Sequence, residues 1–149
     1  MEVKMALSHA YPATRHQVAP LIDLSDRTER KRLSAGAVRA FFNIMDKWKV
    51  SDEVARHLLG GMSNGAFYTL KKNGDRLLDE DKLRRISYLV GIFKALNIIY
   101  SDELADRWMQ LPNKNRIFGG MTPCDYLLRG GLPAFSTVRQ LLDARRGGH

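Results

Sequence analysis

The stretch VSDEVARHLLGGMSNGAFYTLKK, residues 50–72, decides how this chain should fold. Ser51 is a typical N-cap residue, and the two acidic residues after it can interact favourably with the positive end of a helix dipole. Gly60 and Gly61 can adopt the positive φ that a tight turn needs. Ser63 can then cap a second helix. The stretch therefore predicts two short helices separated by a glycine turn.

Each of these two helices should have an apolar side for the core and a polar side for solvent. The inner positions at helical spacing are Val54, Ala55, Leu58, Leu59, Ala66, Phe67 and Leu70, with Met62 between the helices. Asn73–Gly74 should end the second helix. The residues of this helix that should be exposed to solvent are Asn64, Gly65, Tyr68, Thr69, Lys71 and Lys72. We therefore expect a helix-turn-helix whose second helix has an exposed, hydrogen-bonding outer face.

That outer face carries the chemistry that a DNA major groove requires. Asparagine can form two hydrogen bonds with adenine, hydroxyl groups can bond base edges or phosphates, and lysines attract phosphate oxygens. A helix-turn-helix presents the N-terminal half of its second helix to base edges. We predict base-proximal positions for Ser63, Asn64, Tyr68 and Thr69, and phosphate contacts for Lys49, Lys71 and Lys72. The alternative is a helical hairpin that serves only packing or dimerisation.

The composition is compatible with a nucleic-acid partner and argues against a disulfide-bonded, membrane-spanning or secreted protein. The net charge of the 149 residues is +8, with +3 on residues 34–78 and +4 on residues 112–149. A basic surface attracts phosphate backbones, although a merely soluble basic protein has the same composition. The single cysteine excludes an intrachain disulfide and suits the cytoplasm. No apolar run reaches the ~18 residues of a membrane span, and the N-terminus lacks the pattern of a secretory signal.

The helix-turn-helix should be preceded by one helix and a flexible arm. Residues 1–33 show no hydrophobic period, and we predict a flexible arm there, with a short turn near residues 21–24. Order should begin at Leu33 or Ser34, with Ser34 as the N-cap. The helix that follows should bury Val38, Phe41, Phe42, Met45 and Trp48, which recur at helical spacing.

A long apolar helix should follow the helix-turn-helix. Asp79 is the expected N-cap, and the helix should reach about Asn97. Its buried face should consist of Leu83, Ile86, Leu89, Val90, Phe93 and Leu96. Tyr88 and Ile92 lie off this stripe and widen the apolar arc. We therefore expect two parts of the protein, or two subunits, to share this helix.

The last third should contain three shorter helices. The first should begin at Ser101 and end near Gln110, before Pro112. Thr122 followed by Pro123 is typical of a helix start, and the glycine pair at residues 130–131 should end that helix. The final helix should span about residues 133–145 and bury Val138, Leu141 and Leu142 on one side.

This last third also resembles a known family. The run PNKNRIFGGMTPCDYLLRGG, residues 112–131, followed by VRQLLDARRGG, residues 138–148, is similar to the C-terminal toxin-binding region of Xre/MbcA/ParS antitoxins. The residues that carry the resemblance are Trp108, Leu111, Pro112, Asn113, Phe118 to Gly120, Pro123, Gly130, Gly131 and Leu142 to Gly147. With the helix-turn-helix included, the resemblance covers residues 34–149.

The resemblance implies a partner and a mechanism. Antitoxins of this family pair with RES-domain toxins, which degrade NAD. The antitoxin blocks access to the toxin's active site, and together with the toxin it represses its own operon. The toxin-binding residues implied here are Asn113, Arg116, Phe118, Arg129, Leu141, Arg145, Arg146, Gly147 and Gly148. The two arginines of the tail could pair with acidic groups or occupy a phosphate-accepting pocket, and the two glycines suit a narrow cleft. The alternative is a tail that is frayed until a partner orders it.

An enzyme is not indicated by the sequence. The four histidines are scattered, Cys124 has no histidine beside it, and no metal-ligand spacing or phosphate-binding glycine loop is present. We therefore expect no catalytic residue, metal or cofactor.

The expected protein is an all-α, dimeric, DNA-binding antitoxin with an arm at residues 1–33. A helix-turn-helix domain should span residues 34–97, and a toxin-binding domain should span residues 98–149. The alternatives are a transcriptional regulator with a C-terminal dimerisation or ligand-sensing module and no toxin partner, and a purely structural interaction protein.

Overall fold

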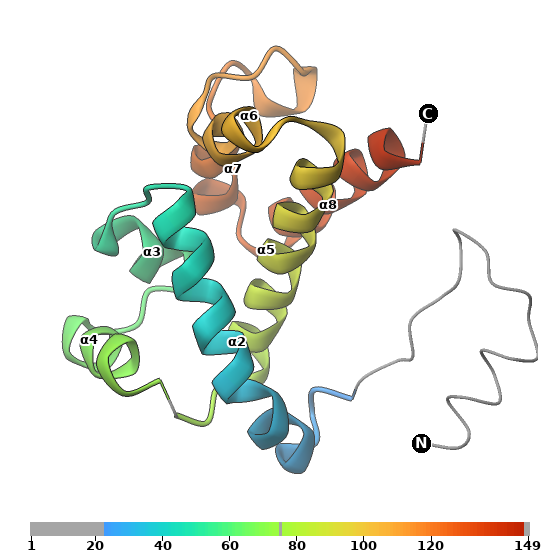
Figure 1. Ribbon diagram of the computed structural model, residues 1–149. Coiled ribbons are helices and arrows are strands. Elements are labelled where there is room, and N and C mark those ends of the chain that lie inside the picture. The colour runs from blue at the N-terminus through green and yellow to red at the C-terminus, as the bar shows by residue number, and fades with distance from the viewer. Residues whose placement is uncertain (1–22, 75, 148–149) are drawn as a thin grey trace, which may run out of the picture.

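All regular secondary structure in the described part of the chain is helical. The computed structural model describes residues 23–74 and 76–147. Its helices are α2 (Arg27–Lys47), α3 (Asp52–Leu58), α4 (Asn64–Asn73), α5 (Glu80–Ile99), α6 (Asp102–Arg107), α7 (Pro123–Gly130) and α8 (Leu132–Arg146). Two short 3-10 helices, η1 (Trp108–Gln110) and η2 (Arg116–Phe118), lie between α6 and α7. The expected all-α fold is confirmed (Figure 1).

Helix α5 is the central element of the fold. Helix α2 packs along one side of it and α8 along another, and α6 follows at its C-terminal end (Figure 1). Leu89 and Ile92 on α5 are completely buried, as are Phe41 of α2 and Phe135 of α8. One core therefore runs through the chain, and the wide apolar arc of α5 is explained because two parts of the protein share this helix.

The start of α2 differs from the prediction. The helix begins at Arg27, and its N-cap is Asp26, whose side chain accepts a hydrogen bond from the Thr28 N–H. Ser34 is therefore not a cap but lies inside the helix. No residue in the first two turns of α2 is fully buried, so no apolar period marks these turns in the sequence. Most of the predicted arm, residues 1–22, lies outside the described residues.

Ser34 has a structural role that its sequence position did not indicate. Its hydroxyl is buried, donates to the Arg30 carbonyl oxygen at 2.6 Å and accepts from the Leu78 N–H at 3.0 Å. This bond joins α2 to the segment that connects α4 with α5. It therefore fixes the C-terminal side of the helix-turn-helix against the first helix.

The other predicted helix starts are confirmed, and one glycine makes a sharp joint. Ser51, Ser63, Asp79, Ser101 and Thr122 each cap a helix by accepting a backbone hydrogen bond. Gly131 alone separates α7 from α8, with φ 64° and ψ −152°. Only glycine adopts this backbone conformation readily, so Gly131 allows α8 to begin one residue after α7 ends.

Candidate nucleic-acid interface and C-terminal module

The turn between α3 and α4 is closed by backbone and side-chain hydrogen bonds. Gly60 (φ 100°) donates to the His57 carbonyl oxygen at 2.9 Å, and Gly61 (φ 82°) donates to the Arg56 carbonyl oxygen at 3.0 Å. These two bonds form a Schellman motif, which requires a left-handed residue after the helix. The Arg56 guanidinium also donates to the Met62 carbonyl oxygen at 2.8 Å. The predicted glycine turn is therefore present and fixed in one conformation.

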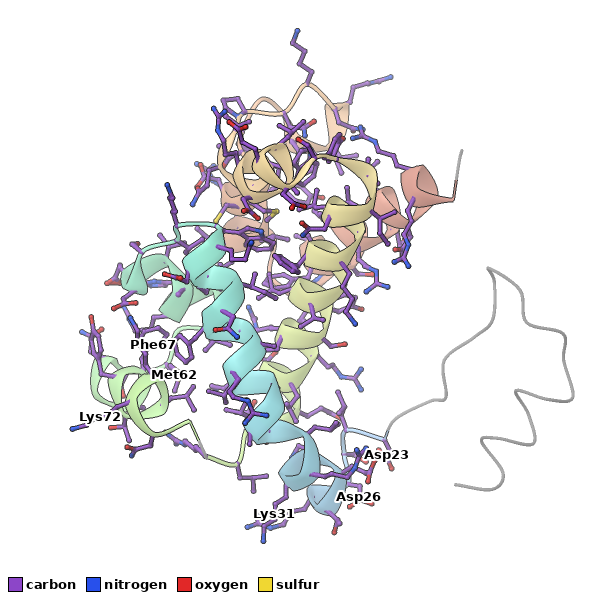
Figure 2. The ribbon with its side chains drawn as sticks, in the orientation of Figure 1. Asp23, Asp26, Lys31, Met62, Phe67 and Lys72 are labelled. Carbon is purple, nitrogen blue, oxygen red and sulfur yellow. The ribbon has the colours of Figure 1, made fainter. Side chains whose placement is uncertain are left out.

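Helix α4 presents the predicted polar face to solvent. Phe67 and Leu70 are buried, and the Phe67 ring contacts Phe42 of α2 edge-on, with 5.5 Å between centroids. The exposed residues of this helix and its cap are Ser63, Asn64, Gly65, Tyr68, Thr69, Lys71, Lys72 and Asn73. Tyr68 is 53% exposed. In Figure 2, Phe67 points from α4 toward α2, whereas Lys72 points away from the rest of the molecule.

The two lysines near the end of α4 differ in their surroundings. The Lys71 ammonium lies 2.8 Å from one carboxylate oxygen of Asp52 and 3.1 Å from the other. This hydrogen bond raises the pKa of Lys71 and links α4 to the first turn of α3. Lys72 takes part in none of the ion pairs found among the described residues. Lys72 is thus the lysine whose charge is more available to a phosphate.

Lys49 lies apart from the other predicted DNA-binding residues. It ends α2 in a left-handed conformation (φ 56°), with its N–H donating to the Asp46 carbonyl oxygen and the next N–H donating to Met45. Its side chain lines a hollow of about 540 Å³ between the end of α2 and α6, together with Glu103 and Arg107. The structure therefore brings Ser63, Asn64, Tyr68, Thr69, Lys71 and Lys72 together on α4 and leaves Lys49 beside α6.

In the C-terminal module, three aromatic rings pack against one another as part of the common core. The Phe118 ring is packed edge-on between Trp108, at 5.9 Å, and Tyr126, at 5.3 Å. Its exposed fraction is 0%. Gly119 (φ 57°) and Gly120 (φ 89°) turn the chain so that this ring points inward. The prediction that Phe118 touches a toxin is corrected accordingly, because a completely buried side chain packs the module and offers no contact surface.

The remaining predicted toxin-binding residues do not form one cluster. Asn113 is half-buried and accepts a hydrogen bond from the Asn115 N–H at 2.8 Å, which shapes the loop before η2. Arg116 is exposed on η2. Arg129 lines a hollow of about 500 Å³ between α3 and the joint of α7 and α8. Leu141 is partly buried on α8. These residues therefore come from four different elements: the loop before η2, η2 itself, α7 and α8.

The tail residues are placed at the end of α8. The Arg145 guanidinium donates to the Tyr100 hydroxyl at 2.8 Å, which ties the end of α8 to the end of α5. Arg146 is exposed, and Gly147 ends the helix with its N–H donating to the Asp143 carbonyl oxygen at 3.0 Å. Gly148 lies outside the described residues. The Arg145–Tyr100 contact spans 45 positions, so no local pattern in the sequence could have indicated it.

Arg85 connects the helix-turn-helix with the C-terminal module and was missed in the sequence. Its guanidinium bonds Asp81 at 2.8 Å and the Leu58 carbonyl oxygen at 3.4 Å, and it lies over the Phe135 ring at 5.5 Å from the centroid. These contacts join α5 to the end of α3 and to α8. The sequence signal was only an arginine one turn after an acidic residue, which is common on any exposed helix.

Cysteine chemistry and metal ligation were the two site types that the sequence left to be placed in the structure. Cys124 is buried, and this burial raises the pKa of its thiol to about 11, so the thiol stays protonated at neutral pH. No group of three or more metal-ligating side chains occurs in residues 23–74 and 76–147. In that same part of the chain, no helix is long and apolar enough to cross a membrane.

Both halves of the chain match sequence models of known protein domains. The sequence model of the Antitoxin Xre-like helix-turn-helix domain matches residues 29–91, and that of the Antitoxin Xre/MbcA/ParS C-terminal toxin-binding domain matches residues 95–148. An uncharacterized protein, y4oB, of Sinorhizobium fredii (strain NBRC 101917 / NGR234) is 36% identical over 130 residues, which cover 87% of this chain and 98% of that protein. No solved structure gives a significant match. The chain therefore belongs to the Xre/MbcA/ParS antitoxins, with a helix-turn-helix domain followed by a toxin-binding domain.

Proposed function

We propose that this antitoxin neutralises a RES-domain toxin that degrades NAD, by blocking the toxin's active site, and that it represses its own operon. The observation that carries the proposal is the separation of two surfaces on one shared hydrophobic core. Helix α4 lies at the lower left of Figure 1, and α6 with the loop after it lies at the top. One chain can therefore hold operator DNA and a protein partner together.

On the DNA side, we propose that α4 enters the major groove. Asn64 and Thr69 are exposed and carry donors and acceptors for base edges, and Tyr68 adds an exposed aromatic ring. Ser63 uses its oxygen to accept from the Ala66 N–H, which leaves its hydroxyl hydrogen for a phosphate. Lys72 supplies the accessible positive charge. A homodimer would place two such helices on two half-sites and gain specificity.

On the toxin side, the supported candidates are the exposed cations of the module. Arg116, Arg129 and Arg146 are exposed, and Arg145 is held by Tyr100 at the end of α8. Arginine can form two parallel hydrogen bonds with a carboxylate, so these cations suit acidic groups on the toxin surface. No cofactor or catalytic step in this chain is needed for such inhibition, and both partners would be met in the cytoplasm.

Two assays test the proposed function. In the first, the chain is co-expressed with a RES-domain protein from the same organism, and complex formation and NAD consumption are measured. We expect a stable complex and suppressed NAD loss; a RES-domain protein that stays unbound and fully active would contradict the proposal. This result would also separate an antitoxin from a regulator that has no toxin partner.

The second assay measures DNA binding by gel shift on a promoter fragment of the operon. Asn64→Ala and Lys72→Ala should each weaken the shift, because one removes a base contact and the other a phosphate contact. Lys94→Ala is the matched control, since Lys94 is an exposed lysine on α5. Equal shifts for all three variants would refute the assignment of α4.

A further inference from the structure

Large apolar side chains that remain exposed are unevenly distributed over the described residues. The four that are exposed are Tyr68 (53%), Ile98 (58%), Leu104 (39%) and Ile117 (37%). Tyr68 belongs to the proposed DNA face of α4. The other three all lie within residues 95–148, the part that matches the toxin-binding domain. The side chains left uncovered in this domain are therefore of the kind that protein interfaces bury.

Ile98 and Leu104 stand on either side of one corner of the fold. Ile98 is in the last turn of α5, Tyr100 ends that helix, and Leu104 is in the first turn of α6. Between them, Ser101 caps α6 by accepting a hydrogen bond from the Leu104 N–H at 3.4 Å. In Figure 1 this corner, where α5 meets α6, lies at the end of the molecule remote from α4.

The end of α8 arrives at the same corner and brings a positive charge with it. The Arg145 guanidinium donates to the Tyr100 hydroxyl at 2.8 Å, in a partly buried setting. Arg145 forms none of the ion pairs found in the described part of the chain, so its charge is held in place without being neutralised by a carboxylate. Arg146 beside it is exposed. Arg145 is therefore bound at Tyr100, the residue that lies in the chain between Ile98 at the end of α5 and Leu104 at the start of α6.

We propose that this corner, formed by Ile98, Leu104 and the Tyr100–Arg145 pair, is a contact surface for the toxin. Ile98 and Leu104 are its apolar anchors, and Arg145 faces an acidic group of the toxin. The inference rests on the proposed toxin binding and names the place where it occurs. Tyr100 is a positioning residue: it fixes the arginine before binding, so that less rotational freedom is lost on association.

The test compares variants of the full chain for affinity to the RES-domain protein, by calorimetry. Ile98→Ser and Leu104→Ser should each weaken binding roughly 30-fold, the effect of losing an anchor that contributes about 2 kcal/mol. Both sites are exposed, so thermal unfolding should stay close to that of the wild type. Tyr68→Ser is the matched control: it removes an exposed apolar side chain at the other end and should leave toxin affinity unchanged.

The positioning role of Tyr100 has its own readout. Tyr100→Phe should weaken toxin binding in the wild-type background but have no further effect in a chain that already carries Arg145→Ala. Additive losses in this double-mutant cycle would show that Tyr100 does not act through Arg145 and would overturn its role.

Three outcomes distinguish the possible failures. If the wild-type chain does not bind the RES-domain protein, the proposed function fails and the inference fails with it. If the wild type binds and both serine variants bind equally well, the corner is not the interface and the inference alone is overturned. If the serine variants instead convert a dimer into a monomer in light scattering, with toxin affinity unchanged, the corner holds a second copy of this chain and the inference is overturned too.

Discussion

Replacing Ser34 by alanine tests whether the bond between α2 and the α4–α5 segment stabilises the helix-turn-helix. Ser34 is 3% exposed and Leu78 is 2% exposed, so water cannot replace the lost hydroxyl at the Leu78 N–H. A buried donor left without a partner costs about 1–3 kcal/mol. Alanine returns up to about 0.5 kcal/mol through its higher helix propensity. The expected net loss is about 0.5–2.5 kcal/mol of unfolding free energy.

Unfolding in urea is monitored by circular dichroism, and the variants are compared when the dependence of the unfolding free energy on urea concentration is the same for each. Ser87→Ala is the matched control, because Ser87 is exposed on α5 and makes no comparable bond. We expect the control to stay within about 0.5 kcal/mol of the wild type, as surface substitutions do. If Ser34→Ala is as stable as the control, then the Ser34 hydroxyl does not secure the Leu78 N–H, and the reasoning is refuted.

Three further predictions follow from single residues. Lys49→Gly should raise the unfolding free energy by up to about 1 kcal/mol in urea titration, because Lys49 is held at φ 56° where glycine has no steric cost; a loss of stability would contradict this. Gly131→Ala should lower the unfolding free energy by about 1–3 kcal/mol, because the φ of 64° and ψ of −152° at Gly131 suit only glycine. An unchanged midpoint of urea unfolding would contradict this. Burial raises the pKa of the Cys124 thiol from 9.0 to about 11, so the native state keeps a proton that the unfolded state loses between these values. Stability should therefore fall by about 2–3 kcal/mol from pH 9 to pH 11, and Cys124→Ala should lose less over the same range; parallel curves for the two proteins would exclude this cause.

The local elements of the fold could be predicted from the sequence because their determinants are local. A serine, threonine or aspartate before an apolar period gives a cap that uses its own side chain, and Ser51 and Ser63 confirm this. The glycine turn at Gly60–Gly61 follows equally from residues within a few positions. The wide apolar arc of α5 also predicted a shared helix correctly.

The start of α2 and the burial of Phe118 could not be predicted in this way. The first turns of α2 bury little, so only the cap at Asp26 marks them, and Ser34 looked like the better cap until its bond to Leu78, 44 residues away, was known. Phe118 is the last residue of the short 3-10 helix η2, and the backbone turn at Gly119 and Gly120 that follows it is not visible as an apolar period in the sequence.

At the candidate sites, the sequence did not indicate which charged side chains are paired, because their partners lie far away in the chain. Lys71 is paired with Asp52, 19 positions earlier, so the two neighbouring lysines of α4 are not equivalent. Arg145 is held by Tyr100, although the sequence suggested only a basic, glycine-rich tail. In both cases the partner lies on another helix, and a periodic pattern along one helix carries no information about it.

The most direct test of the account is a gel shift in which the chain, a promoter fragment of its operon and the RES-domain protein are combined in equimolar amounts. Because the face of α4 and the α5–α6 corner lie at opposite ends of the molecule, we expect the toxin to add to the DNA complex and retard it further. Asn64→Ala should weaken both retarded bands, and Ile98→Ser only the slower one. Release of the chain from DNA by the toxin, or no retardation at all, would contradict the claim that one chain binds both partners through separate surfaces.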